Sequence, residues 1–216
     1  SYCNLGYGLV GTMIENVSGE RFDLYQKKHV LIPLGIDGGY DPALLSRPER
    51  LATLYHHTAR GYEAAKDSSA NFVPEASAQY RIGTNATIFS PQGGLRISMR
   101  DLAAIGRMFL KEGDGFLTPQ SIATLETPAW TYDGHNGDTA SGFYCQYGLA
   151  NQTVPTKVAG CADDLFGDGS RHVGHAGDAY ALRSGLWLDR ARGTGVAFFA
   201  SAVPDGASTL WRWCAS

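Results

Sequence analysis

The sequence lacks the features that mark membrane, nucleic-acid-binding and zinc-binding proteins. Its apolar stretches, such as residues 196–203, are far shorter than the roughly 20 residues that a membrane-spanning helix needs. Lysine and arginine are scattered along a chain with a net charge of −3, so no basic surface for phosphates is expected. The four cysteines form no Cys-x-x-Cys pair and have no histidines at zinc-like intervals. We therefore expect no membrane span, no nucleic-acid partner, no metal site and no cofactor.

The composition is that of a folded globular protein. Of the 216 residues 44% are hydrophobic and 18% are charged, and 27 are glycine, which indicates many turns and close backbone approaches. Cys145 and Cys161 bracket a polar loop, and two interpretations stay open for them. They are either buried free thiols or a disulfide that closes about 15 residues and stabilises the fold by roughly 3 kcal/mol.

The first third of the chain predicts two helices followed by an irregular stretch. Apolar residues recur at helical spacing over residues 5–17, and Gly19 follows as a stop signal. A second, shorter helix is expected over about residues 21–31, before Pro33. Residues 36–95 are rich in turn-forming residues and give no long periodicity.

The middle of the chain predicts two capped helices. Ser98 is placed to cap a helix with Asp101 in its first turn, and Gly113 follows its end. Thr118 is placed to cap a second helix that begins with a proline and ends before Pro128. The two helices flank a Gly-Asp-Gly turn.

The last third predicts strands. Residues 181–189 and 194–202 are rich in Val, Trp and Phe and form an expected hairpin, with 172–176 as a further strand or the approach to one. Ser208 is placed to cap a final helix. Helices first and an antiparallel sheet last argue for an α+β fold.

Three short motifs lie in order along the chain. Tyr2-Cys3-Asn4 runs into the first helix, Gly93-Gly94-Leu95 leads into the capped helix at Ser98, and residues 174–177 read Gly-His-Ala-Gly before the hairpin. Each motif alone is a weak signal, and their order, spacing and structural setting together carry the argument. Over roughly residues 1–203 the chain resembles the superfamily of penicillin-binding proteins and serine β-lactamases, which includes DD-peptidases and esterase-like members.

The resemblance implies a β-lactamase/transpeptidase-like α+β fold, in which helices flank an antiparallel sheet beside a helical lobe. It implies one partial domain over residues 1–216, with the helical lobe at about 1–130 and the sheet portion at about 140–216. The N-terminal strands and the nucleophile helix of that fold have no counterpart here, so the fold is expected to be incomplete. A periplasmic or secreted location is favoured by the resemblance alone.

The resemblance also implies roles for particular residues. Tyr2 would share the proton transfers, and its phenolate would need a neighbouring cation, either His175 or the family's lysine. Asn4 would orient the substrate amide, and His175 would hydrogen-bond to the site or polarise it. Gly177 would let substrate approach the strand edge, and the backbone N–H of Asp178 would donate to the oxyanion.

Each of these residues also has an ordinary structural interpretation. Tyr2 at a helix entrance is typical of a packing residue, Asn4 there is typical of a cap, and His175 in a glycine-rich turn is typical of a solvated loop.

Two further groups of polar residues are interpreted as structural. His56 and His57, taken as helical neighbours, point about 100° apart and are expected to be a surface pair, not a chelate. Asp163, Asp164 and Asp168 lack calcium-loop spacing and are expected to form a solvated turn.

The family's nucleophile is missing from the sequence. The family's serine stands in Ser-x-x-Lys, and none of the five lysines here has a serine three residues before it. No Gly-x-Ser-x-Gly motif replaces it. We expect the chain alone to be inactive, with an exposed sheet edge and apolar face covered by an N-terminal segment of the same protein, a second chain or a swapped copy. The residues at those five positions are Leu24, Tyr25, Glu63, Met108 and Val154.

Three functional hypotheses follow. The first is a serine hydrolase that forms an acyl-enzyme with a small-molecule or peptide substrate: a peptide, amide, β-lactam or ester. His175 in place of lysine tilts it towards a D-alanyl carboxypeptidase, D-aminopeptidase or esterase-like member. The second is a non-catalytic family member or fragment that binds peptidoglycan-like ligands or a protein partner. The third is an unrelated interaction domain, which predicts that Tyr2, Asn4 and His175 lie far apart.

Overall fold

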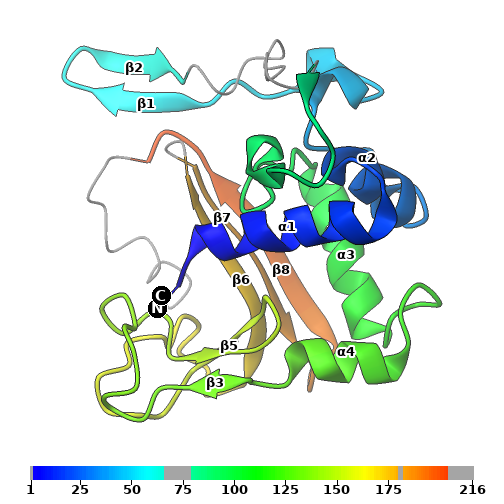
Figure 1. Cartoon of the computed structure of the whole chain (residues 1–216). Coiled ribbons are helices and arrows are strands. Elements are labelled where there is room, and N and C mark those ends of the chain that lie inside the picture. The colour runs from blue at the N-terminus through cyan, green and yellow to red at the C-terminus, as the bar shows by residue number, and fades with distance from the viewer. Residues whose placement is uncertain (1, 66–78, 180–181, 204–216) are drawn as a thin grey trace.

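A computed structural model describes residues 2–65, 79–179 and 182–203 (Figure 1). The chain begins with α1 (Asn4–Ser18), which confirms the helix predicted over 5–17. Gly19 ends it with φ of 71° in the left-handed region, and its N–H donates to the carbonyl of Glu15 at 2.8 Å. The second predicted helix is present as α2 (Phe22–Gln26) and a π-helical turn, Lys27–Leu31.

The two capped helices are also confirmed. Ser98 caps α3 (Met99–Leu110) and accepts a hydrogen bond from the backbone N–H of Asp101 at 3.1 Å. Thr118 caps α4 (Pro119–Glu126) in the same way, accepting from the N–H of Ser121 at 3.1 Å. None of the helices formed by the described residues is long and apolar enough to cross a membrane.

Six antiparallel strands form one sheet in chain order, β3-β4-β5-β6-β7-β8. The predicted hairpin is confirmed, and the strand before it runs three residues beyond its expected end at Ala176. Ser208 lies outside the described residues. The strands are β3 (Trp130–Thr131), β4 (Gln146–Tyr147), β5 (Gln152–Val154), β6 (His172–Ala179), β7 (Leu182–Asp189) and β8 (Thr194–Ala200).

The stretch between α2 and α3 contains a separate two-stranded hairpin, which lies apart from the larger sheet in Figure 1. The helical interpretation of His56 and His57 is wrong, because both lie in a strand of this hairpin and so point to opposite faces. They still form no chelating pair. The hairpin strands are β1 (Tyr55–Thr58) and β2 (Gly61–Ala64), and the 3₁₀ turns of this stretch are Pro42–Leu44, Pro48–Arg50 and Ala86–Phe89.

The sheet is covered on both faces. On one face a core forms around the buried Trp187, Ala176 and Val154. On the other face α3 packs against β7 and β8, and a Cβ added at Gly106 would lie 3.0 Å from Leu186 Cδ1. A methyl group at Gly106 would therefore require the leucine side chains of β7 to shift by a few tenths of an ångström.

A buried carboxylate joins α1 to the segments around it. Glu15 is 0% exposed, and its oxygens accept from the N–H of Phe22 at 2.8 Å, the hydroxyl of Tyr80 at 2.5 Å and the N–H of Gly83 at 2.8 Å. Three donors satisfy the charge that burial would otherwise penalise. The position of α1, and of the motif that precedes it, depends on these bonds.

We expect Glu15→Ala to lower the free energy of unfolding by roughly 3 kcal/mol, because it leaves buried donors without an acceptor. Urea denaturation of the protein would measure the change, with Glu49→Ala at an exposed position as the control. An equal stability for both variants would contradict the structural role given to Glu15.

Candidate active site

The first and third motifs meet in space. Tyr2 lies just before α1, and its ring centroid is 5.8 Å from that of His175 on β6, with an angle of 49° between the planes. The prediction that these residues lie far apart, made by the hypothesis of an unrelated domain, is therefore wrong. His175 lies within a strand and not in a solvated loop, which corrects its ordinary structural interpretation.

Three more tyrosines surround this pair. Tyr144 stacks on Tyr2 with centroids 4.9 Å apart and planes at 7°, and Tyr147 meets the ring of His175 edge-on at 5.7 Å. The hydroxyls of Tyr7 and Tyr147 are 2.7 Å apart. Tyr2, Tyr7, Tyr144, Tyr147 and His175 are called the aromatic cluster below.

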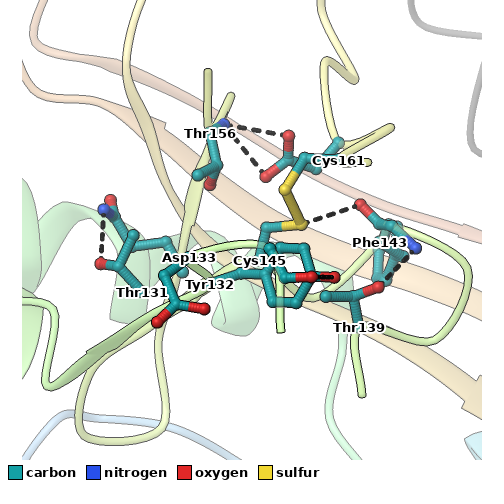
Figure 2. The surroundings of a disulfide bond; sticks show 12 residues. Thr131, Tyr132, Asp133, Thr139, Phe143, Cys145, Thr156 and Cys161 are labelled. Atoms are coloured by element: carbon teal, nitrogen blue, oxygen red, sulfur yellow. Dashed lines mark hydrogen bonds between the residues drawn. A yellow bond between two sulfur atoms is a disulfide. The ribbon is translucent and has the colours of Figure 1, made fainter. Parts of the chain in front are cut away.

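The segment that carries Tyr144 and Tyr147 is held by a disulfide (Figure 2). Cys145 and Cys161 are joined with their Cα atoms 6.1 Å apart, which decides between the two interpretations left open for them. The carbonyl of Cys145 also accepts from the N–H of Tyr132 at 2.8 Å. The bridge fixes the backbone between the two tyrosines of the cluster.

The acidic segment after this bridge is partly buried, which corrects the expectation of a solvated turn. Asp163 is 1% exposed, and its two oxygens lie 2.9 and 3.1 Å from the N–H of Thr156, which donates to them. Burial raises the pKa of Asp163, and the bonds from Thr156 oppose that rise. Its carboxylate supports the loop beside the disulfide.

The imidazole of His175 favours the neutral form. Burial lowers the pKa of His175 below 6.5, opposed by the carbonyl of Ala176, which lies 2.5 Å from Nδ1 and can only accept. The hydrogen is therefore on Nδ1, and Nε2 is left as an acceptor. Nε2 is buried and has no hydrogen-bond partner among the described residues.

The lowered pKa of His175 favours the family's lysine over His175 as the cation that a Tyr2 phenolate would need. Burial raises the pKa of Tyr2, as do Tyr7 and Cys3, and no cation is among the groups that shift it. Burial also raises the pKa of Tyr144, to about 12, and the pKa of Tyr147. Tyr2, Tyr144 and Tyr147 therefore all favour the protonated form.

The other predicted site residues flank the cluster. Asn4 is the first residue of α1 and is exposed, and the helix cap is Cys3, so Asn4 does not cap the helix. Packing explains the glycine at position 177, because a Cβ there would lie 2.3 Å from Ser184 Oγ on β7. The carboxylate of Asp178 forms an ion pair with Arg183, its partner across the β6–β7 ladder.

The edge of β6 beside the cluster is open to an extended ligand. β5 pairs with β6 only as far as Gly174, while β7 pairs with it from His172 to Ala179. Residues 175–179 thus pair with one neighbouring strand among the described residues. The unpaired side presents backbone groups that can bind an extended substrate as an added strand.

Sequence reasoning missed Tyr7, Tyr144 and Tyr147. Tyr7 lies on the helix that follows Tyr2, and the other two lie on either side of Cys145. The sequence signal that could have indicated them is that tyrosines are frequent in these two segments. No periodicity marks them, because the turn-rich backbone around Tyr144 is shaped by the disulfide.

Comparison with solved structures shows a β-lactamase/transpeptidase-like fold. A penicillin-binding protein homologue from Pyrococcus abyssi, described as octameric, matches with a TM-score of 0.65 at 21% identity over 94% of this chain and 38% of its own. A D-amino acid amidase from Ochrobactrum anthropi SV3 matches with 0.63 at 16% over 96% and 56%. A class C β-lactamase mutant matches with 0.62 at 13% over 95% and 54%.

This fold class is that of the serine β-lactamase and penicillin-binding protein superfamily, as the three motifs predicted. The family model described as Beta-lactamase matches residues 1–212, and the chain belongs to this family. No curated protein matches the chain. The chain spans between 38% and 56% of the length of these three structural neighbours.

The disulfide leads to a test of stability with a matched control. We expect the double change Cys145→Ala and Cys161→Ala to lower the free energy of unfolding by about 3 kcal/mol, because the open chain gains entropy when unfolded. Urea denaturation would measure it, with Cys3→Ala as the control at the exposed free thiol. A double variant as stable as the control would show that the bridge adds nothing.

The neutral state of His175 leads to a pH test. Its folded pKa lies below 6.5, so the unfolded chain binds the proton more readily, and stability is lost as the pH falls below about 6.5. We expect the NMR signal of its Cε1 proton to titrate at a lower pH in the folded protein than in a short unfolded peptide around His175. A titration at the same or a higher pH in the folded protein would contradict a buried neutral imidazole.

Proposed function

We propose that this chain forms the substrate-binding and proton-transfer part of a serine hydrolase that acts through an acyl-enzyme on an amide or peptide. The observation that carries the proposal is the contact of Tyr2 with a neutral His175 beside the open edge of β6. In this proposal the nucleophile comes from a Ser-x-x-Lys segment. That segment is not part of the printed sequence.

Each group has a role that fits its protonation. Tyr2 keeps its proton at pH 7 because burial raises its pKa, so it donates to the leaving nitrogen, while the lysine of the nucleophile segment takes the proton of the attacking serine and passes it to Tyr2. The buried Nε2 of His175 accepts a hydrogen bond from the substrate or from that segment. Asn4 orients the substrate amide, and the N–H of Asp178 lies at the strand edge that would hold the oxyanion.

A linear amide substrate is favoured over a β-lactam by the residue at position 175. His175 stands where many relatives have a lysine, and a neutral imidazole attracts a substrate carboxylate less than an ammonium group does. The structural neighbours do not decide between the two substrates, since two are described as a D-amino acid amidase and a D-stereospecific amidohydrolase and two as class C β-lactamases. We therefore propose a D-amino acid amide or peptide as the first candidate substrate. Carboxypeptidase and esterase activities are the second candidates.

Two exposed surfaces support a completing segment. On α1 the apolar side chains of Leu5, Leu9, Met13 and Val17 are four residues apart, lie on one face and are 61%, 56%, 63% and 91% exposed. Strand β8 pairs with β7 alone among the described residues. We propose that the segment carrying the nucleophile covers this helix face and adds a strand to β8, whether it comes from the same polypeptide or from a second chain.

The proposal is tested by acylation of the natural full-length product and of this chain. We expect a fluorophosphonate or penicillin probe to add one adduct to the full-length product and none to this chain alone, as intact mass would show. If the full-length product forms no adduct, the non-catalytic hypothesis, a fragment that binds peptidoglycan-like ligands or a protein, takes its place.

In the full-length product we expect Tyr2→Phe to slow acylation by about 10²- to 10⁴-fold, since it removes a proton donor from the reaction. Tyr62→Phe, at an exposed position of the β1–β2 hairpin, is the matched control. Stopped-flow or quenched mass spectrometry would follow the rates. Equal rates for the two variants would remove Tyr2 from the mechanism.

A further inference from the structure

Three potential metal ligands lie together at the start of β6, apart from the aromatic cluster. Asp168 precedes the strand, His172 begins it, and Asp189 ends β7 as the direct cross-strand partner of His172. One ligand atom from each lies within 4.8 Å of the others. Since successive strand residues alternate faces, His172 and His175 point to opposite sides of the sheet. The proposed hydrolase mechanism uses none of the three.

The ring of His172 is held in one orientation. The residue is 6% exposed, Phe166 stacks on it at 3.9 Å with planes at 21°, and Nδ1 lies 3.1 Å from the carbonyl of Ser170. A carbonyl can only accept, so Nδ1 is the donor in this contact, and the lone pair of the imidazole can lie only on Nε2. Metal-binding histidines are held by such a bond from their second nitrogen.

That lone pair faces two carboxylates. Nε2 is 3.7 Å from Asp168 Oδ2 and 4.0 Å from Asp189 Oδ2, beyond hydrogen-bond distance in both cases. The two carboxylates bring two negative charges close together, and a cation between them would offset their repulsion.

The two carboxylates are arranged alike. The outer oxygen of each is held by a backbone N–H: Oδ1 of Asp168 accepts from Ser170, and Oδ1 of Asp189 accepts from Arg192, both at 2.9 Å. The other oxygen of each carboxylate, Oδ2, faces the space between the three residues. This is the arrangement of ligands that the surrounding backbone has already oriented.

A guanidinium now neutralises part of this charge. Nη1 of Arg192 contacts Asp168 Oδ2 and lies 3.0 Å from Asp189 Oδ2, and the Arg192 side chain is 55% exposed. It can therefore move out into solvent without unpacking the core. A divalent ion in place of the guanidinium would carry two positive charges, enough to balance the two carboxylates.

We propose that Asp168, His172 and Asp189 bind a zinc ion in exchange for the Arg192 guanidinium. One imidazole nitrogen and two carboxylate oxygens, completed by water, form a ligand set that zinc accepts. Tetrahedral bonds of 2.0–2.1 Å place ligand atoms about 3.3 Å apart, so the 3.7 and 4.0 Å separations need to close by only a few tenths of an ångström. The ion would fasten the loop of Asp168 to the β6–β7 ladder.

The test uses the full-length protein after dialysis against a chelator. We expect added Zn²⁺ to raise its melting temperature and added Co²⁺ to produce visible d–d absorption bands. Asp168→Asn, at a partly exposed residue, should weaken zinc binding by 10- to 100-fold in calorimetric titration. His172→Gln should abolish the cobalt bands, and His135→Gln at an exposed loop position is the control.

Arg192→Ala separates this proposal from a simple ion-pair cluster. Removal of the competing cation should tighten zinc binding by about tenfold or more. If neither the wild-type protein nor Arg192→Ala binds Zn²⁺ or Co²⁺, the proposal is overturned and the group is an ion-pair cluster with Arg192. The readouts are independent of hydrolysis, so failure of one proposal leaves the other standing.

Discussion

The ladder between β6 and β7 is the interaction on which the rest of the molecule depends. Each strand has eight residues, and the pairing is continuous from His172 and Asp189 at one end to Ala179 and Leu182 at the other. Gly174 allows the two strands to approach, since a Cβ there would lie 2.0 Å from the carbonyl oxygen of Leu186. One ladder thus positions His175 on one face and His172 on the other.

Two buried polar side chains, Glu15 and His175, differ in whether their hydrogen-bonding groups have partners. Glu15 is buried as a carboxylate and finds three donors, whereas His175 is buried as a neutral ring with Nε2 unpaired among the described residues. All three hydrogen bonds to Glu15 come from this chain, and they stabilise the fold. The imidazole of His175 has a free acceptor next to the open edge of β6, which is typical of a site that receives a ligand.

Local signals predicted most of the fold. The caps at Ser98 and Thr118, the stop at Gly19 and the final hairpin are each encoded by residues next to one another in the chain. Capping and turn geometry are local, so they can be read without the tertiary structure. The strand through His175 was expected to be shorter, because its glycines weaken a strand signal that the pairing with β7 restores.

The remaining features depend on tertiary contacts. The β1–β2 hairpin turns at Ala59-Arg60, which carries no strong turn signal, and His56 was therefore placed on a helix. Asp163 was expected in solvent because neighbouring acidic residues suggest a polar turn, and it is buried because the N–H of Thr156 needs an acceptor. The meeting of Tyr144 with Tyr2 joins segments that lie far apart in the sequence, which no local pattern records.

The disulfide has a consequence for the aromatic cluster. Cys145 lies between Tyr144 and Tyr147, whose rings contact Tyr2 and His175, so the sulfur bridge restrains the backbone that places both rings. If the bridge were reduced, the helices and the β6–β7 ladder would keep their hydrogen bonds, while the segment around Tyr144 and Tyr147 would loosen. The arrangement of these aromatic rings is thereby coupled to the redox state of one pair of sulfur atoms.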